Sequence, residues 1–298
     1  MLVGAIDIGT NSARYLLAEV GPELKVMRVE TALKTTRLGE GIASGLLTEQ
    51  AMARTAAAVA EFWRRAQSMG AQVITAVATS AVRGARNREE FLALVRQTTG
   101  LEVRVLSGDE EAFYTFAGVV TGLEVDREKT AVVDIGGGST ELIWIEKGRI
   151  ILHSLPLGAV RLTEEGGGPA KAEALLGPFH RFLSGRRIIG TGGTITTLAA
   201  ISQGIASYDP AKIHGYLLEP EEVAALTGKL AGLSLSDRKK VPGLQPERAD
   251  IIVAGAGILT ALFDLTGAPG ITVSENDILY GVAFNTAGGV ERKLAGKC

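Results

Sequence analysis

Cysteine is almost missing from this sequence, and so is an excess of charge of either sign. The 298 residues include a single cysteine, Cys298, so one chain can form neither a disulfide nor a cysteine-based zinc site. The formal net charge is only −2, whereas a general nucleic-acid-binding protein is normally clearly basic. We therefore expect no nucleic-acid partner, although a local basic site is compatible with this balance.

Long apolar runs are also missing. The longest one, residues 251–263, contains two glycines and a threonine, and it is shorter than the about 20 residues that a bilayer span requires. No basic stretch precedes the apolar residues at the N-terminus, so a signal peptide is not expected. These two absences predict a soluble cytoplasmic protein without a membrane partner.

Hydrophobic residues and glycine are present in quantity. Hydrophobic residues make up 46% and charged residues 21% of the chain, which excludes a disordered protein and predicts a buried core. At roughly 100–200 residues per domain, the length suggests two domains. The 38 glycines against only 9 prolines indicate tight turns and close backbone approaches rather than linkers.

One stretch of the sequence occurs twice. Residues 5–12 read AIDIGTNS, and residues 132–139, which lie 127 positions further on, read VVDIGGGS. Each copy is an apolar run, then Asp-Ile-Gly, small polar residues and a second strand-like run, which predicts a β-hairpin. Because a strand rather than a helix follows, neither copy is a dinucleotide fingerprint or a P-loop. The spacing is too long for a solenoid unit and suits a whole domain.

The order of the predicted elements supports two similar halves of an α/β protein. The first half reads βββαβαβα, the second half opens with three strands in the same way, and the polar stretch 124–129 is the predicted joint. We predict strands near 2–8, 13–20, 24–32, 72–78, 102–106, 130–135, 140–146, 149–155, 186–190 and 270–274, and helices near 48–69, 87–99, from 108, 170–184, 193–202, 219–231, 247–265 and 277–287.

The two predicted hairpin turns carry groups that suit a phosphate and a metal ion. Backbone N–H groups in such turns bind anions, and a neighbouring carboxylate is the kind of ligand that Mg²⁺ prefers. The alternative is an ordinary polar hairpin, with Glu141 pointing to solvent. The candidate phosphate-binding residues are Gly9, Thr10, Asn11 and Ser12 in the first turn and Gly136, Gly137, Gly138, Ser139 and Thr140 in the second, and the candidate metal ligands are Asp7, Asp134 and Glu141.

Three further segments have both a functional and a structural interpretation. Gly192 and Gly193 lie in a turn between a strand and a helix, where backbone N–H groups could bind an anion or simply form a tight turn. Arg83 opens a run with three arginines in six residues, which suits phosphate binding or a solvated face. Glu111 is either a general base or one of the acids that favour a helix start, and this segment alone favours the second interpretation.

Together these motifs make the chain similar to the exopolyphosphatase/guanosine pentaphosphate phosphohydrolase (Ppx/GppA) family. The most specific combination is DIGGGSTEL at 134–142 with SGDEEA at 107–112 upstream. Order and spacing fit that family along nearly the whole chain. The other matching segments are 7–14, 37–41, 79–83 with Asn87, 190–194, 242–244 and 248–250.

The resemblance implies an α/β actin-like fold, as in the superfamily of sugar kinases, Hsp70 and actin, with two ribonuclease-H-like domains around a cleft. We place the domains at 1–124 and 125–298, and the last helix, at about 284–298, is a candidate to pack back on the first domain. Long members carry extra C-terminal domains, so this chain resembles the short, two-domain type. Where many relatives have Arg-Glu before the last helix, this chain has Leu279 and Tyr280, so the role of that pair is not carried over.

The resemblance also implies roles for single residues. Glu111 falls on the family's proposed general base, Arg83 on a phosphate-contacting arginine, and Asp134 and Glu141 on carboxylates that bind metal or position water; we take Glu111, Glu141 and Arg83 as catalytic. The expected function is an exopolyphosphatase that releases terminal orthophosphate from inorganic polyphosphate, with Mg²⁺ or Mn²⁺ as cofactor. The alternatives are hydrolysis of the 5′-phosphate of guanosine pentaphosphate, an actin-fold kinase, and a non-catalytic sensor of phosphorylated nucleotides. The oligomeric state stays open, with a homodimer among the options.

Overall fold

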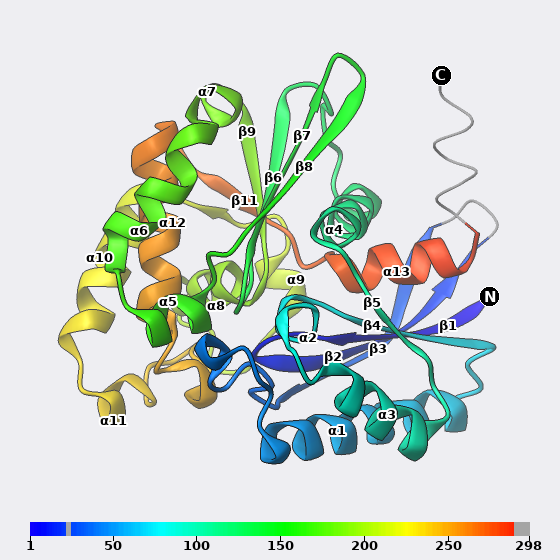
Figure 1. Cartoon of the computed structure of the whole chain (residues 1–298). Helices are drawn as coiled ribbons and strands as arrows, with labels where there is room; N and C mark the ends of the chain where they lie inside the picture. The colour runs from blue at the N-terminus through cyan, green and yellow to red at the C-terminus, as the bar shows by residue number, and fades with distance from the viewer. Residues whose placement is uncertain (22–24, 289–298) are drawn as a thin grey trace. The chain divides into compact units, whose positions relative to one another are not determined.

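The chain divides into two compact units in the computed structural model, which describes residues 1–21 and 25–288 (Figure 1). Unit 1 comprises Met1–Gly122 together with the chain from Asn276 onward. Unit 2 comprises Leu123–Glu275. Each unit is described below by itself.

The division differs in one respect from the ranges 1–124 and 125–298 that the sequence suggests. The chain crosses into unit 2 near the expected joint, but it returns to unit 1 at Asn276. Of the helix expected at about 284–298, residues 289–298 lie outside the described residues.

Unit 1 is built on a five-stranded sheet with the strand order β3-β2-β1-β4-β5. The strands β1, β2 and β3 form an antiparallel meander, whereas β4 and β5 run parallel to β1. The carboxyl ends of β1, β4 and β5 therefore meet at one edge, where open α/β sheets hold their ligands. The strands are β1 Leu2–Ile8, β2 Ser12–Val20, β3 Val26–Thr35, β4 Val73–Ala78 and β5 Val103–Val105.

Helices cover both faces of the unit 1 sheet (Figure 1). The helices α1 and α3 pack over Ile6 and Ile8 of β1, while α4 and α13 pack on the opposite face over Val3 and Ala5. Because successive side chains of a strand point to opposite faces, a strand buried on both sides is apolar along its length. The helices are η1 Ile42–Ser44, α1 Glu49–Ser68, α2 Ser80–Gly84, α3 Arg88–Thr99, α4 Gly108–Gly122 and α13 Ile278–Thr286.

Unit 2 is built on a six-stranded sheet with the strand order β10-β11-β9-β6-β7-β8. Here β6, β7 and β8 form the antiparallel meander, and β9 and β11 run parallel to β6. The strands are β6 Thr130–Ile135, β7 Thr140–Glu146, β8 Arg149–Leu155, β9 Arg187–Thr191, β10 Leu217–Leu218 and β11 Ile271–Val273. The helices are α5 Ala159–Glu165, α6 Gly168–Leu176, η2 Gly177–Phe179, α7 His180–Leu183, α8 Gly193–Ser202, α9 Pro210–Ile213, α10 Pro220–Gly232, α11 Leu235–Arg238, η3 Pro246–Arg248 and α12 Ile252–Thr266.

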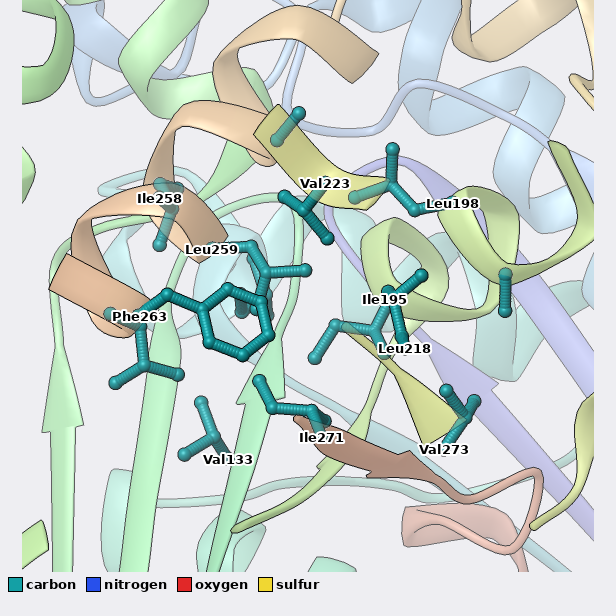
Figure 2. Packing of buried hydrophobic residues seen from close by; sticks show 14 of the residues in the cluster. Val133, Ile195, Leu198, Leu218, Val223, Ile258, Leu259, Phe263, Ile271 and Val273 are labelled. Carbon is teal, nitrogen blue, oxygen red and sulfur yellow. The ribbon is translucent and has the colours of Figure 1, made fainter. Parts of the chain in front are cut away.

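The core of unit 2 forms around α12, which contains most of the longest apolar run of the sequence. Figure 2 shows Leu259 and Phe263 of this helix beside Val133 of β6, Ile195 of α8 and Ile271 of β11. Burial of most of this helix accounts for its apolar composition. No helix in the described part of the chain has both the length and the apolar content of a bilayer span.

The repeat in the sequence forms two equivalent hairpins, as predicted. In β1–β2 the residue opposite Asp7 is Arg14, and in β6–β7 the residue opposite Asp134 is Glu141. Both turns are closed in the same way, by a backbone N–H of the glycine after Asp-Ile that donates to a serine carbonyl three residues on. The two distances are equal, 3.0 Å for Gly9 N to Ser12 O and 3.0 Å for Gly136 N to Ser139 O.

The structure differs from the sequence prediction in several stretches, and the elements α5, α9, α11 and β10 were not predicted. The five-residue helix α2, which is too short to show a helical period, extends the predicted order of the first half. The helix predicted at 170–184 is interrupted at Gly177–Phe179, where Pro178 lacks the N–H that would continue the hydrogen bonding. The helix predicted at 247–265 begins only at Ile252, after a 3₁₀ turn.

Candidate functional site

The sheet of unit 1 brings three of the predicted site residues to one edge. Asp7 lies at the end of β1, Arg83 in the short helix after β4, and Glu111 in the first turn of the helix after β5. These three strands are neighbours and run parallel, so their carboxyl ends coincide. The topology thus assembles residues that are 76 and 28 positions apart in the sequence.

Glu111 is a buried carboxyl group held by one arginine. Arg83 Nη1 donates to Glu111 Oε2 at 2.7 Å and to the carbonyl oxygen of Leu106 at 2.9 Å, which fixes the guanidinium beside the acid. Burial raises the pKa of Glu111 to about 7, against the opposing effect of Arg83. A carboxyl group that titrates near neutral pH is suited to take up a proton in catalysis.

The neighbouring Glu110 caps the start of α4, which is the structural role expected for the acids of this segment. Its side chain accepts the Ser107 N–H at 2.8 Å, and Ser107 Oγ accepts the Glu110 N–H at 3.1 Å, which together form a capping box at the start of α4. The hydrogen bond from Ser107 holds the pKa of Glu110 below its usual range. Helix capping therefore explains Glu110 and leaves Glu111 to the functional interpretation.

Asp7 belongs to a group of charges formed by two buried aspartates and a partly buried arginine, of which only Asp7 was predicted as a site residue. Its Oδ2 atom accepts two N–H bonds from Arg14, at 2.9 Å from Nε and 2.7 Å from Nη2, and Arg14 Nη1 donates to Asp277 Oδ2. Burial raises the pKa of Asp7, and Arg14 opposes this shift. Arg14 could have been found from the repeat, because it occupies the position that Glu141 holds in the second copy.

The first hairpin turn is braced by the segment that follows β3. The carbonyl oxygen of Asn11 accepts the N–H of Arg37 at 2.8 Å, and that of Thr10 accepts the N–H of Gly39 at 2.8 Å. Arg37 adopts a left-handed backbone with φ of 51°, which is unusual for a side-chain-bearing residue and is found at sites that the surroundings constrain. A Cβ at position 39 would overlap the Thr10 side chain, so the glycine is required for this contact.

The second hairpin turn is braced by the N-terminus of α5. The carbonyl oxygen of Gly137 accepts the N–H groups of Val160 at 2.8 Å and Arg161 at 3.1 Å, and Arg161 Nε donates to the Gly138 carbonyl oxygen at 2.9 Å. A Cβ at Gly158 would overlap the Gly137 backbone. These bonds orient the turn through its carbonyl groups, and its N–H groups are the type of donor that an anion requires.

The two carboxylates of unit 2 stand side by side. Asp134 and Glu141 are directly opposite in the β6–β7 ladder, which places their side chains on the same face of the sheet. Both are buried, and Ser154 Oγ donates to Glu141 Oε1 at 2.8 Å. Glu141 therefore does not point to solvent, and that structural alternative is wrong.

The glycine-rich turn at 190–194 has a packing role in the structure. Gly192 has a φ of 90°, and a Cβ there would overlap Asp134 Oδ1. A Cβ at Gly193 would overlap the guanidinium of Arg248, which is itself buried. The glycines thus make room for Asp134 and Arg248, and their expected contact with phosphate stays a prediction.

The acidic residues fit a magnesium ion that takes its remaining ligands from water and phosphate. No group of three or more His, Cys, Asp or Glu residues suited to a metal occurs among residues 1–21 and 25–288. Mg²⁺ usually needs only one or two protein carboxylates, since waters and substrate phosphates complete its octahedron. Asp7 Oδ1 is fully buried and accepts no hydrogen bond within the described structure, as expected for an oxygen that a cation completes.

The two residues that this chain has in place of the Arg-Glu pair are part of the core. Leu279 and Tyr280 are buried in α13, in the cluster that packs on the β1 face with Val3 and Ala5. Burial explains why apolar and aromatic residues are accepted at these two positions.

Comparison with known proteins identifies the family. The sequence pattern of the Ppx/GppA phosphatase family matches residues 18–287. Exopolyphosphatase 2 of Mycobacterium tuberculosis is 34% identical to this chain, over 96% of this chain and 98% of its own length. A bifunctional 3-dehydroquinate synthase/phosphatase of Fusobacterium nucleatum is 32% identical, and this chain corresponds to 47% of it.

Solved structures agree with this assignment. An exopolyphosphatase from Cytophaga hutchinsonii has a TM-score of 0.88 at 25% identity, covering 97% of this chain and 99% of its own. The Ppx/GppA family member of Aquifex aeolicus has a TM-score of 0.76 at 30% identity, covering 96% and 97%. The fold is the two-domain actin-like fold, the protein is a phosphatase, and the chain belongs to the Ppx/GppA phosphatase family.

Proposed function

We propose that this protein is an exopolyphosphatase that releases terminal orthophosphate from inorganic polyphosphate. The observation that carries the proposal is the buried Glu111 carboxyl group, with a pKa of about 7, in contact with Arg83. Hydrolysis of a phosphoanhydride needs a group that accepts a proton from water and positive charge near the phosphate oxygens. The relative named exopolyphosphatase matches this chain over almost the full length of both proteins, which supports polyphosphate as the substrate.

In this proposal Glu111 acts as the general base. Its ionised form takes a proton from the attacking water as the bond between that water and the terminal phosphorus forms. Arg83 orients Glu111 in the resting protein and supplies a guanidinium that can bind phosphate oxygens in its fork geometry. No covalent enzyme intermediate is required.

The two hairpin turns act as phosphate-binding elements. The N–H groups of Gly9 and Gly136 close the turns, so the donors to phosphate would be other backbone N–H groups within Gly9–Ser12 and Gly136–Thr140. The charge on the phosphate oxygens grows as the leaving group departs. The bracing of each turn through its carbonyl groups favours this role, because it fixes the donors before substrate arrives.

Each unit offers its own candidate ligands for a divalent cation, directly or through water: Asp7 in unit 1, and the paired Asp134 and Glu141 in unit 2. When bound, Mg²⁺ or Mn²⁺ would neutralise charge on the phosphates of substrate and product. Ser154 orients Glu141, and Gly192 leaves the space that Asp134 Oδ1 requires.

Phosphate release from long-chain polyphosphate with Mg²⁺ tests the proposal, with Glu111→Gln compared to Glu110→Gln. We expect the Glu111 variant to lose roughly 10²–10⁴-fold in rate, the contribution of a general base. The Glu110 variant keeps a capping side chain at the same helix start and should stay within a few-fold of the wild type.

Two outcomes would overturn the proposal. Equal losses in the two variants would remove the special role of Glu111. A wild-type protein that leaves polyphosphate intact but releases phosphate from guanosine pentaphosphate would replace the substrate, and binding of that nucleotide without phosphate release would indicate a sensor.

A further inference from the structure

We propose that Arg14 and Asp277 are positioning residues that keep one oxygen of Asp7 available for the divalent cation. In this arrangement Arg14 engages only Oδ2 of Asp7, and Asp277 holds Arg14 in that position. The inference rests on the proposed function in one respect, the assignment of Asp7 as a metal ligand. It adds two residues, Arg14 and Asp277, that have no role in the reaction as proposed above.

The hydrogen bonds of Asp7 are strongly asymmetric. Both N–H groups that Arg14 directs at Asp7, from Nε and Nη2, go to Oδ2, at 2.9 and 2.7 Å. The other oxygen, Oδ1, is buried and accepts no hydrogen bond within the described structure. A buried carboxylate oxygen left without a donor is costly unless a ligand completes it.

This asymmetry differs from the usual geometry of an isolated arginine–carboxylate pair. Arginine and carboxylate groups usually meet as two parallel forks, with one N–H on each carboxylate oxygen. Such a bidentate pair would place a donor on Asp7 Oδ1 and occupy the atom that a cation needs. The structure instead draws the third guanidinium nitrogen, Nη1, to Asp277.

Asp277 is itself fixed at the start of α13. It is the N-cap residue of this helix, and its Oδ1 atom accepts the N–H of Leu279 at 3.0 Å. Its second oxygen, Oδ2, is the one that accepts from Arg14. One carboxylate thus caps the helix and anchors the guanidinium, so the position of Arg14 depends on the position of α13.

Two glycines hold α13 against α4, the helix that carries Glu111. A Cβ at Gly118 of α4 would overlap the carbonyl oxygen of Asp277, and a Cβ at Gly281 of α13 would overlap that of Tyr114. The two contacts are reciprocal. Gly118 lies four residues after Tyr114 in α4, and Gly281 lies four residues after Asp277 in α13. The backbone that carries Asp277 is therefore fixed relative to the helix of the proposed base.

The second hairpin has no arginine at the position that corresponds to Arg14. The residue opposite Asp134 is Glu141, an acid where the first hairpin has Arg14. In unit 2 both opposing residues can serve a cation. In unit 1 only Asp7 can, and an arginine opposite it must be held away from one of its oxygens.

The test is Mn²⁺ binding to the full chain without substrate, followed by electron paramagnetic resonance of the free ion. We expect Asp277→Asn, which keeps a capping oxygen but loses the charge, to bind Mn²⁺ about 10–100-fold more weakly, the range for loss of a supporting residue. Asp209→Asn is the matched control, because Asp209 caps α9 through the Ala211 N–H without an arginine partner in the described hydrogen bonds. This control should bind Mn²⁺ as the wild type does.

A second measurement separates positioning from folding. In phosphate release from polyphosphate, Asp277→Asn should need a higher Mg²⁺ concentration for half-maximal rate, and excess Mg²⁺ should restore most of its maximal rate. A variant that is merely misfolded would not be rescued by the ion. If Asp277→Asn does not fold, Asp277→Ser, which also offers a capping oxygen, takes its place.

The outcomes distinguish this inference from the proposed function. Mn²⁺ affinity and Mg²⁺ requirement both unchanged in the Asp277 variants would overturn the role of Asp277 and leave the proposed function intact. A Mn²⁺ affinity that Asp7→Asn leaves unchanged, or a wild type that binds no Mn²⁺, would remove Asp7 as a ligand and overturn this inference with it. Loss of phosphate release in Glu111→Gln is measured independently of either result.

Discussion

At the scale of the residue, Glu110 and Glu111 show how environment separates two identical side chains. Glu110 is solvated and hydrogen-bonded to Ser107, which lowers its pKa, while burial raises the pKa of Glu111 to about 7. The sequence places both acids in a helix start and favours capping for the pair. Burial, together with the contact to Arg83 that the path of β4 and α2 provides, distinguishes Glu111 from Glu110.

The raised pKa of Glu111 predicts a pH-dependent stability. In the unfolded chain this group titrates near 4.5, so the folded state binds the proton more tightly and is favoured below that pH. The free energy of unfolding that this group contributes is lost as the pH rises from about 4.5 through about 7, with a total on the order of 3 kcal/mol. Thermal unfolding of wild type and Glu111→Gln at pH 5 and pH 8 measures it.

We expect the difference in Tm between Glu111→Gln and wild type to move in favour of the variant between pH 5 and pH 8. Glu110→Gln serves as the control and should show no such gain. An equal Tm difference at both pH values would contradict the burial of an ionisable Glu111.

At the scale of the element, the contact of α4 with α13 depends on the absence of side chains. A methyl group at Gly118 would overlap the Asp277 carbonyl, so Gly118→Ala should destabilise the protein by about 1–3 kcal/mol or more through overpacking. Gly257, inside α12, has no atom near an added Cβ, so Gly257→Ala should instead stabilise by about 0.5–1 kcal/mol. Urea unfolding of the two variants measures both effects, and a neutral Gly118→Ala would show that the helices can separate at no cost.

Periodicity predicted most elements, because they are long or strongly patterned. The three strands from 130 to 155 and the helix at 193–202 were predicted with the bounds that the structure has. Short helices such as α2 and α9 were not predicted, because five or four residues are too few to show a helical period. The interruption near Pro178 followed from backbone chemistry that the periodic pattern did not reveal.

At the scale of the whole molecule, the repeat predicted two related halves because its two copies share both composition and spacing. It could not predict the asymmetry between them. Arg14 and Glu141 occupy equivalent positions with opposite charge, and Asp277, which anchors Arg14, comes from a part of the chain more than 260 residues away. Such a long-range partner has no local signal in the sequence.

The role of Glu111 as general base is tested by the pH dependence of kcat/KM for phosphate release from long-chain polyphosphate with Mg²⁺. This constant reports groups of the free enzyme. We expect a rate that rises with pH as Glu111 ionises, with a midpoint at about 7. The residual activity of Glu111→Gln should lack this rise. A rate that is flat from pH 5 to pH 8, or a wild-type protein that releases no phosphate from polyphosphate, would contradict this role.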